Sequence, residues 1–518
     1  MIRFRLIALL TIATAAAQQS VDILIQGGQL IDGTGTTEAR PADVGIQGDR
    51  IVFIGDAAKA KIKAARTIKA QGLIVSPGFI DPHAHVFEDL SDTRRKTNEN
   101  YLRQGVTTVV AGNDGAGPFN IKTAIDKWKT SGIGTNAVLL VGYGSVRREV
   151  LGMSAKAPTP EQLDSMRGLV KKAMEEGAFG FSTGLFYTPQ NFGTTEEVIE
   201  LAKVAAKYDG IYDSHIRDES TYSIGLLGAI EETIRIGRES GIRVHISHIK
   251  ALGVDIWGKS ADAIALIRKA RAEGVRITAD QYPYTASGSS LHASLLPPWS
   301  QEGGQARLIE RLNDAAQLAK IEQETAENMR RRGGADSFLL LSPRDATIRN
   351  KRLGEVAKAW KVTPVEAALR IIRNGGSGVA SFNMSEDDIE AFMKEDWVMT
   401  CSDGSSGHPR KYGTFPRKIR KYVMDRKVIP LHTAIHRSSG LTADTFQIAN
   451  RGRIVNGAFA DVIVFDPATI RDTATYEEPE KLAVGMRWVF VNGRAAIEDG
   501  KYTGVLEGKA LGRSQAAK

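Results

Sequence analysis

Short β-rich runs recur eight times along the middle of this 518-residue chain, and segments with helical periodicity separate most of them. The eight predicted strands are 73–80, 107–112, 137–143, 179–184, 211–216, 243–249, 276–284 and 397–401, and the clearest predicted helices are 161–176, 196–208, 227–239 and 261–273. Strand–helix alternation favours an α/β fold with a parallel sheet. Eight such units predict a closed, TIM-like (β/α)8 barrel.

Short strands also occur at both ends of the chain, where helical periodicity is absent. They are predicted at 21–25, 44–47, 50–55, 460–465 and 488–491, with Gly48-Asp49 and Asn492-Gly493 as turns. This pattern predicts one small β domain of the sandwich type, built from residues 21–75 and 456–500, beside a barrel of residues 76–455. The interval 286–395 is too long for one crossover, so it predicts an insertion over the barrel mouth between the seventh and eighth strands.

Residues 1–17 have the pattern of a secretory signal peptide. Two arginines precede an apolar segment at 6–17, and small residues at 15–17 occupy the cleavage positions. The apolar segment is too short for a membrane span. We therefore expect an exported protein, periplasmic or secreted, with no membrane span once the signal is cleaved. The single cysteine, Cys401, excludes an internal disulfide, so the fold must be stable through its core.

The net charge of the chain, +8 at pH 7, raises the question of a nucleic-acid partner. The basic residues are spread out, however, without the basic–aromatic interleaving or finger spacing of nucleic-acid binders. We therefore expect no nucleic-acid partner and a small-molecule substrate instead. The apolar content of 42% provides enough material for a large core.

Two histidines follow the first predicted strand, in the segment Ser-Pro-Gly-Phe-Ile-Asp-Pro-His-Ala-His at 76–85. Side chains alternate along a strand with a period of two, so His83 and His85 point to one face. Two imidazoles on one face form half of a metal site. The alternative is a pair of packed or surface histidines, so the prediction depends on ligands at other strand ends.

The other strand ends do carry such residues. In a (β/α)8 barrel the active site lies at the C-terminal ends of the strands. Four histidines and two carboxylates are expected to converge there: His83, His85, Asp114, His215, His248 and Asp403. On the sixth strand His248 shares a face with Lys250, whereas His245 lies on the other face. His248 is therefore the predicted ligand, and His245 a packed or supporting residue.

At this point the chain resembles a known family. Its ordered motifs are similar to those of the amidohydrolase superfamily and, within it, of the D-aminoacylases, or N-acyl-D-amino-acid deacylases. The motifs are SPGFIDPHAH, GVTTVVAGNDG, GFSTGLFYTPQ, SHIRDE, HISHIK, DQYPY, SDGSSGHPRKYGTFPR and GRIVNGAFADVIVFDPATIRDTATYE. They run in family order over nearly all of residues 21–500, so the set is far more specific than the histidine pair alone.

The resemblance implies a metal centre. His215 and His248 would hold one tight zinc ion, while His83, His85 and Asp403 would line a second position for a divalent ion. The family usually has cysteine where this chain has Asp114. A carboxylate is a harder ligand than a thiolate and tolerates other divalent ions, and its two oxygens could bridge two metals. The alternative for Asp114 is a turn residue, because Asn-Asp-Gly is favourable turn chemistry.

The resemblance also implies the reaction, which is hydrolysis of the amide of an N-acyl-D-amino acid. Metal-bound water would be the nucleophile, because zinc lowers the pKa of water from about 15.7 to about 7. Asp403 would act as general base and then as general acid. Lys250, Tyr282 and Arg410 would engage the substrate carboxylate. Tyr187 would lie beside the scissile amide, and Phe186 would help to form the side-chain pocket.

Four alternative functions remain open. A D-residue dipeptidase or a cyclic-amide amidohydrolase would use the same chemistry. Many barrels of the superfamily bridge two metals with a carboxylated lysine on the fourth strand. Residues 179–184 contain no lysine, which counts against this type of barrel. The Gly-x-Ser-x-Gly sequence at 180–184 fits a serine hydrolase only between a strand and an immediately following helix, and here a loop is predicted to follow. An inactive exported binding protein is the fourth alternative.

Overall fold

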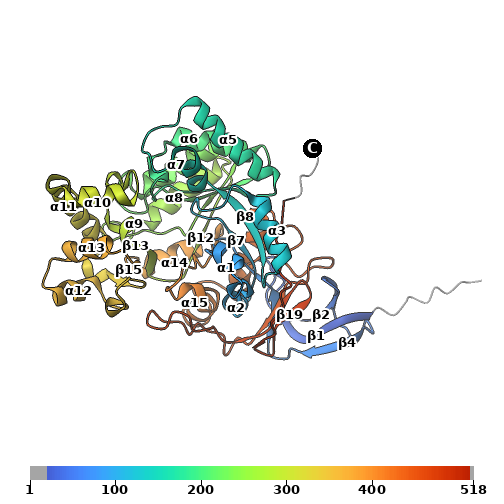
Figure 1. Ribbon diagram of the computed structural model, residues 1–518. Helices are drawn as coiled ribbons and strands as arrows, with labels where there is room; N and C mark the ends of the chain where they lie inside the picture. The colour runs from blue at the N-terminus through green and yellow to red at the C-terminus, as the bar shows by residue number, and fades with distance from the viewer. Residues whose placement is uncertain (1–19, 514–518) are drawn as a thin grey trace, which may run out of the picture.

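Eight parallel strands form the centre of the chain in the computed structural model, which describes residues 20–513 (Figure 1). In spatial order they are β16 (Val398–Thr400), β12 (Ile277–Gln281), β11 (Arg243–Ile246), β10 (Ile211–His215), β9 (Gly180–Gly184), β8 (Asn136–Gly142), β7 (Val106–Ala111) and β6 (Phe79–Asp81). The two outer strands approach each other where they end, since Asp403 N donates to His83 O at 2.9 Å. The predicted (β/α)8 barrel is confirmed.

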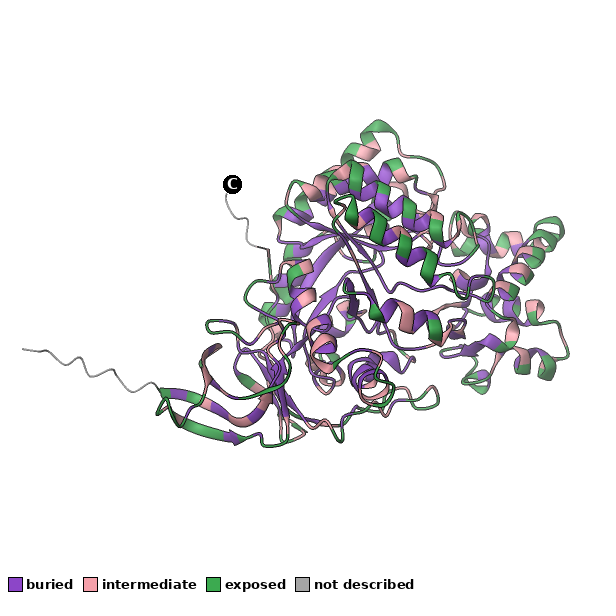
Figure 2. Cartoon of the chain, turned by 180° about the vertical axis from the view of Figure 1, so that it is seen from behind, coloured by how far each residue is buried: buried purple, intermediate pink, exposed green. Residues whose placement is uncertain are grey.

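Amphipathic helices surround this barrel and carry a buried face toward it and an exposed face outward (Figure 2). The longer ones are α3 (Ile121–Ser131), α5 (Pro160–Glu175), α6 (Thr195–Ala206), α7 (Gly225–Ser240) and α8 (Ser260–Ala272). Local sequence sets where they begin and end. Helix α5 starts with a capping box, in which Thr159 Oγ1 accepts from Gln162 N and Thr159 N donates to Gln162 Oε1. Helix α7 ends at Gly241, whose φ of 71° suits glycine.

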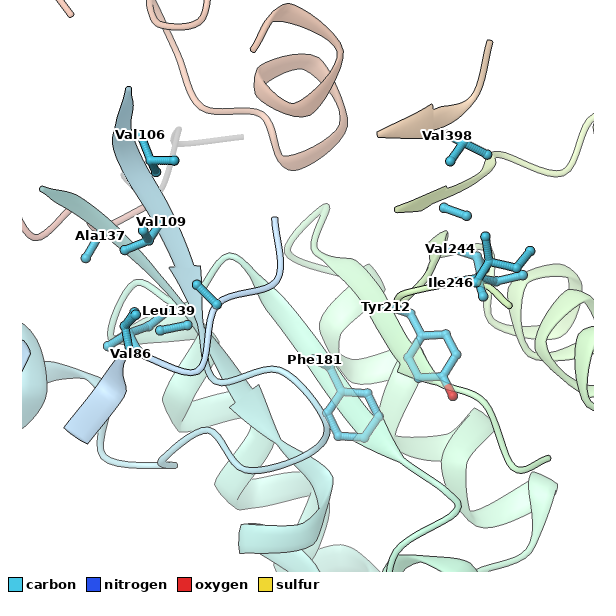
Figure 3. Close-up of a cluster of buried hydrophobic side chains, with 14 of the residues drawn as sticks. Val86, Val106, Val109, Ala137, Leu139, Phe181, Tyr212, Val244, Ile246 and Val398 are labelled. Atoms are coloured by element: carbon cyan, nitrogen blue, oxygen red, sulfur yellow. The ribbon is translucent and has the colours of Figure 1, made fainter. Parts of the chain in front are cut away.

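In several barrel strands, neighbouring residues belong to different apolar clusters. In β8, Ala137 and Leu139 join the large cluster between sheet and helices (Figure 3), whereas Val138 and Leu140 pack with Phe446 of α17 (Gly440–Phe446). Burying one such aliphatic side chain contributes about 1.5–3 kcal/mol. The bodies of these strands therefore contribute to two apolar clusters, whereas polar residues occupy their C-terminal ends.

A separate sheet is assembled from the two ends of the described chain. Its nine strands are β1 (Ser20–Leu30), β2 (Arg40–Gln47), β3 (Arg50–Gly55), β4 (Lys63–Lys69), β5 (Ile74–Pro77), β17 (Val462–Phe465), β18 (Met486–Val491), β19 (Arg494–Glu498) and β20 (Lys501–Tyr502). The N-terminal and C-terminal strands meet where β5 pairs antiparallel with β17. Turns at Gly48-Asp49 and Asn492-Gly493 connect strands as predicted. The expected β module built from both chain ends is confirmed.

One predicted strand is in fact two. The run at 73–80 divides into β5, which belongs to the nine-stranded sheet, and β6, which is the first strand of the barrel. Gly78 lies between them, and a Cβ there would come within 2.2 Å of Thr107 Oγ1. Pro77 has no N–H to continue the first ladder, and glycine allows the close approach to Thr107 that starts the second.

The insertion between the seventh and eighth barrel strands is also confirmed. It contains a three-stranded antiparallel sheet with the order β13 (Ala286–Ser290), β15 (Gly378–Phe382) and β14 (Phe338–Leu340). Five helices accompany this sheet: α9 (Leu291–Leu295), α10 (Gln305–Asn313), α11 (Ala315–Arg331), α12 (Leu353–Trp360) and α13 (Pro364–Arg373). These elements enclose their own apolar cluster, which includes Leu308, Phe338 and Leu369. The insertion therefore packs as a unit beside the barrel mouth.

The predicted signal peptide, residues 1–17, lies outside the described residues, so export stays a prediction. Within residues 20–513, none of the helices combines the length and the apolar character needed to cross a bilayer.

A buried ion pair joins two helices beside the barrel. Arg147, in α4 (Tyr143–Leu151), is fully buried, and its Nη1 donates to both carboxylate oxygens of Glu197 at 2.6 and 2.8 Å. Tyr143 Oη also donates to Glu197, at 2.6 Å. Breaking a buried pair leaves an uncompensated charge, which is far more costly than losing a surface pair.

We expect Glu197→Gln to lower the free energy of unfolding by about 3–5 kcal/mol, because Arg147 would remain buried without a counter-charge. Glu196→Gln is the matched control, since the neighbouring Glu196 pairs with Arg235 at the surface. Its unfolding midpoint in urea should be close to that of the wild type. Equal midpoints for the two variants would contradict the role given to the buried pair.

Candidate metal centre

The six predicted metal-site residues lie together at the C-terminal ends of the barrel strands. Asp114 is central. Its Oδ1 lies 3.4 Å from His83 Nε2, 3.6 Å from His215 Nδ1 and 3.5 Å from His248 Nε2, and its Oδ2 lies 3.5 Å from His85 Nε2. His215 Nδ1 and His248 Nε2 are 2.9 Å apart. Histidines from three strand ends thus surround one carboxylate, so Asp114 is placed as a ligand would be, beyond its part in a turn.

Asp403 supplies a second carboxylate to the same cluster. Its Oδ1 lies 3.0 Å from His85 Nε2 and 3.8 Å from His83 Nε2. Its Oδ2 lies 2.8 Å from Arg410 Nη1. No cation flanks Asp403 in the sequence, so the pairing with Arg410 is supplied by the fold. In this structure Arg410 meets a carboxylate of the protein where the sequence had suggested a carboxylate of the substrate.

Several ligand atoms of this cluster are buried without a hydrogen-bond partner. They are both ring nitrogens of His83, Oδ1 of Asp114 and Nε2 of His215. Leaving buried polar atoms unpaired costs about 1–3 kcal/mol each. The atoms offered by His83, Asp114, His248 and Asp403 all lie within 4.8 Å of one another. Imidazole and carboxylate donors at this spacing fit a divalent metal ion, which would satisfy them together.

The backbone at the site is constrained. Asp114, His248 and Asp403 have φ values of 55°, 35° and 46°, in the left-handed region that non-glycine residues rarely adopt. Such conformations cost of order 1–3 kcal/mol each and persist when the surroundings impose them. All three follow directly after the end of a barrel strand or close to it. In these backbone conformations the three side chains lie in the common cluster.

A buried aspartate, Asp280, supports His248 from behind. Its Oδ1 accepts from the backbone N–H of His248 at 2.5 Å, and its Oδ2 lies 2.8 Å from His245 Nε2. The His245 ring packs against Phe446, with ring centroids 5.3 Å apart. His245 is therefore the packed, supporting histidine that strand parity predicted. Asp280 was not singled out from the sequence, although it lies in the motif Asp-Gln-Tyr-Pro-Tyr.

Glu219 is a site residue that the sequence analysis missed. Its Oε1 accepts from Lys250 Nζ at 2.5 Å and lies 3.0 Å from His248 Nδ1. Lys250 Nζ also lies 2.7 Å from His248 Nδ1. With His215 and His248, Glu219 forms a second group of potential ligands. The available signal was its position four residues after His215 in Ser-His-Ile-Arg-Asp-Glu.

Aromatic side chains form one wall of the site. Phe186 stacks on His215 with ring centroids 5.9 Å apart, and Tyr187 lies 4.7 Å from the same ring. Tyr282 lies under the Arg410 guanidinium, 4.5 Å from its carbon, and its hydroxyl contacts Met384 Sδ at 3.6 Å. All the residues predicted for substrate binding therefore lie around the metal-ligand cluster.

Two connected cavities open onto the cluster. The outer one is a cleft of about 490 Å³ whose lining includes His85, Asp403, Arg410 and residues 288–290 of the insertion. The inner one is lined by Phe186, His215, Glu219, Tyr222, His248, Lys250, Tyr282 and Arg332, among others. Tyr187, Gly288, Ser289 and Asp403 line both. The site therefore has two adjoining compartments that share Asp403 in their lining.

The site is strongly charged. Burial lowers the pKa of His83 and His248, but nearby carboxylates outweigh burial and raise these values to about 10 and about 9. Burial raises the pKa of Asp403, but Arg410 and the histidines outweigh it and hold the pKa well below its usual value. His215 differs, because burial dominates and lowers its pKa. The side chains of the site thus include a set of mutually stabilised ions.

Ser182, the central residue of the Gly-x-Ser-x-Gly sequence, is fully buried within β9. Its Oγ donates to Gly112 O at 2.5 Å and accepts from Gly115 N at 3.1 Å. A turn follows the strand, and the next α-helix begins only at Thr195. Ser182 is therefore a structural residue without the exposure of a nucleophile elbow.

Buried imidazoles and carboxylates at the strand ends of a (β/α)8 barrel define the class of metal-dependent hydrolases. The chain belongs to the amidohydrolase family, whose family model matches residues 66–497. Within that family it groups with the D-aminoacylases. It is 35% identical to the D-aminoacylase of Alcaligenes xylosoxydans xylosoxydans over 96% of this chain and 99% of that protein.

Two solved structures are similar to this one. A crystal structure of D-aminoacylase has a TM-score of 0.82 and 32% identity, covering 95% of this chain and 100% of that chain. The N-acyl-D-glutamate deacylase of Bordetella bronchiseptica has a TM-score of 0.81 and 31% identity, with the same coverage. That structure contains zinc and a phosphonate inhibitor that mimics the tetrahedral intermediate. Enzyme class, fold and metal dependence therefore agree with the geometry of the site.

We expect metal binding to release protons. His83 and His248, with pKa values of about 10 and about 9, are protonated at pH 7 and must lose a proton to bind a metal. Zinc binding at pH 7 should therefore release about two protons, and the association constant should increase as the pH rises toward about 10. Titration calorimetry in buffers of different ionisation enthalpy measures both quantities. His83→Asn should release about one proton fewer, and an affinity that is independent of pH would contradict the expectation.

Proposed function

We propose that this protein is a metal-dependent N-acyl-D-amino-acid deacylase, which hydrolyses the amide to a carboxylate and a free D-amino acid. The observation that carries the proposal is the cluster of orphaned imidazole and carboxylate atoms around Asp114, next to cations that can receive a carboxylate. The family and its D-aminoacylase relative support the substrate class. An amide needs both an activated water and a polarised carbonyl, and a bound metal supplies both.

We propose zinc as the metal, held by His215 and His248 together with Asp114, and a second divalent position lined by His83, His85 and Asp403. The zinc in the Bordetella bronchiseptica deacylase supports this choice. Asp114 makes the site harder than a thiolate would, so other divalent ions should also be accepted. The second position combines the buried side chains of His83 and Asp403 with His85, whose side chain is 33% exposed.

Asp403 is the proposed general base and acid. It lies at the junction of the two cavities, within 4 Å of two imidazoles. A carboxylate there would take the proton of the attacking water and return it to the departing amine nitrogen. Arg410 now pairs with Asp403. If Arg410 instead paired with a substrate carboxylate, its stabilising charge would leave Asp403, and the pKa of Asp403 would rise toward that of an effective base.

The proposed carboxylate receptors are Lys250, Tyr282 and Arg410, which present an ammonium group, a hydroxyl and a guanidinium. Burial and nearby carboxylates keep the pKa of Tyr187 well above its usual value. Its hydroxyl therefore stays neutral and can donate to the amide oxygen. Phe186, stacked on His215, would provide the apolar side of the pocket.

The proposal predicts a stereochemical preference and a metal requirement. Wild-type protein loaded with zinc should release amine from N-acetyl-D-leucine at least about tenfold faster than from N-acetyl-L-leucine, measured as kcat/KM. Chelation should abolish this activity, and added zinc should restore it, whereas a serine-directed phosphonate should have no effect. Activity that survives chelation, or a protein that binds no metal after purification, would contradict the proposal.

Asp403→Asn should lose about 10²–10⁴-fold in kcat while it still binds metal, because the other ligands remain and only the proton acceptor is lost. Asp396→Asn is the matched control, since Asp396 precedes the same strand and is exposed. Metal content by atomic emission and kcat are measured on the same preparations. A near-normal rate in Asp403→Asn would refute the assignment.

A further inference from the structure

One buried cation of the inner cavity has no acidic partner. Arg332 follows the end of α11 in the insertion, and only 3% of its surface is exposed. No carboxylate within residues 20–513 forms an ion pair with it, and its Nε donates a hydrogen bond to a hydroxyl. Guanidinium stays protonated in proteins, so the charge cannot be relieved by deprotonation. A buried charge without a counter-ion is costly unless a ligand provides one.

The neutral neighbours of Arg332 set its orientation. Its Nε donates to Tyr222 Oη at 2.5 Å, and that hydroxyl donates in turn to Ser294 O at 3.1 Å. With the Asn383 amide turned so that Oδ1 faces Arg332, this oxygen accepts from Nη1 at 3.2 Å. These contacts hold the guanidinium in place and leave its charge uncompensated.

Arg332 borders the same cavity as the metal-ligand cluster. His248, Lys250 and Asp403 line this cavity with it, and its guanidinium lies 6.0 Å from the ring of Phe186. Lys250, which also lines the inner cavity, pairs with Glu219, and Arg410 of the outer cleft pairs with Asp403. Of the lysine and arginine side chains that line the inner cavity, Arg332 is therefore the one whose counter-charge is missing.

We propose that Arg332 binds a second carboxylate of the substrate, in addition to the α-carboxylate, and so makes the enzyme selective for dianionic N-acyl-D-amino acids. This inference rests on the deacylase function proposed above. A planar guanidinium can hold a carboxylate through two parallel hydrogen bonds. The second carboxylate has two chemical sources: an acidic amino-acid side chain, or a dicarboxylic acyl group such as succinyl.

The test compares three substrates of the zinc-loaded enzyme in one assay of released amine. N-acetyl-D-leucine carries one carboxylate, N-acetyl-D-glutamate adds one in the side chain, and N-succinyl-D-leucine adds one in the acyl group. The variants are R332Q, R332K and R330Q. Arg330, two residues earlier, is the matched control, because it pairs with Asp255 and Glu327 at the surface. Thermal melting confirms that each variant is folded.

The wild type should favour one dianionic substrate over N-acetyl-D-leucine by about tenfold or more in kcat/KM, since a charge-assisted pair in a buried site is strong. R332Q should remove this advantage, so that kcat/KM falls more on the preferred dianion than on N-acetyl-D-leucine. R332K should keep part of the advantage, and R330Q should behave as the wild type. The preferred dianion identifies the source of the second carboxylate.

Three outcomes would overturn the inference. They are no dianionic advantage in the wild type, an equal loss on all three substrates in R332Q, and an R330Q effect as large as that of R332Q. If R332Q does not fold, the wild-type substrate ratio alone decides. The two proposals fail separately: activity on N-acetyl-D-leucine without a dianionic advantage removes only the role of Arg332, whereas no activity on any of the substrates removes the deacylase function.

Discussion

The structure depends on a buried carboxylate, Asp114, that lies among four imidazoles. Its Oδ1 is within 3.6 Å of three ring nitrogens and has no hydrogen bond, and both nitrogens of His83 are equally unpaired. Such a cluster is unfavourable by itself, because desolvated polar atoms need partners. A divalent ion held in this cluster would give Asp114 Oδ1 and the facing nitrogen of His83 a partner. The strained backbone at Asp114, His248 and Asp403 is the cost of holding these atoms together before the ion binds.

Around this centre, nearly every charge has a partner. Lys250 pairs with Glu219, Arg410 with Asp403, and His245 with Asp280. The first two pairs join a proposed substrate-binding cation to a carboxylate beside the metal ligands. A substrate carboxylate would therefore compete with groups of the protein, and its arrival would change the pKa of the residue that moves the proton. Arg332, which lacks such a partner, offers its charge without competition.

The fold divides the work among three units. The barrel supplies rigidity, because alternate residues of its strands belong to apolar clusters on both sides while their C-terminal ends carry the ligands. The insertion provides residues 288–290 of the outer cleft and Arg332 of the inner cavity. The nine-stranded sheet adjoins the first barrel strand through β5, which precedes β6 by a single residue. The proposed selectivity for a second substrate carboxylate thus depends on the insertion, through Arg332.

The sequence by itself determined what is local: strand and helix periods, turn residues, and the histidines that follow strand ends. These features depend on neighbours in the chain, so the eight barrel strands and the six clustered side chains could be predicted. Only the tertiary structure decided what depends on distant partners. The run at 73–80 divided because its halves join different sheets, and Glu219, Arg332 and the Asp403–Arg410 pair emerged because burial and charge pairing are set by residues far apart in the chain.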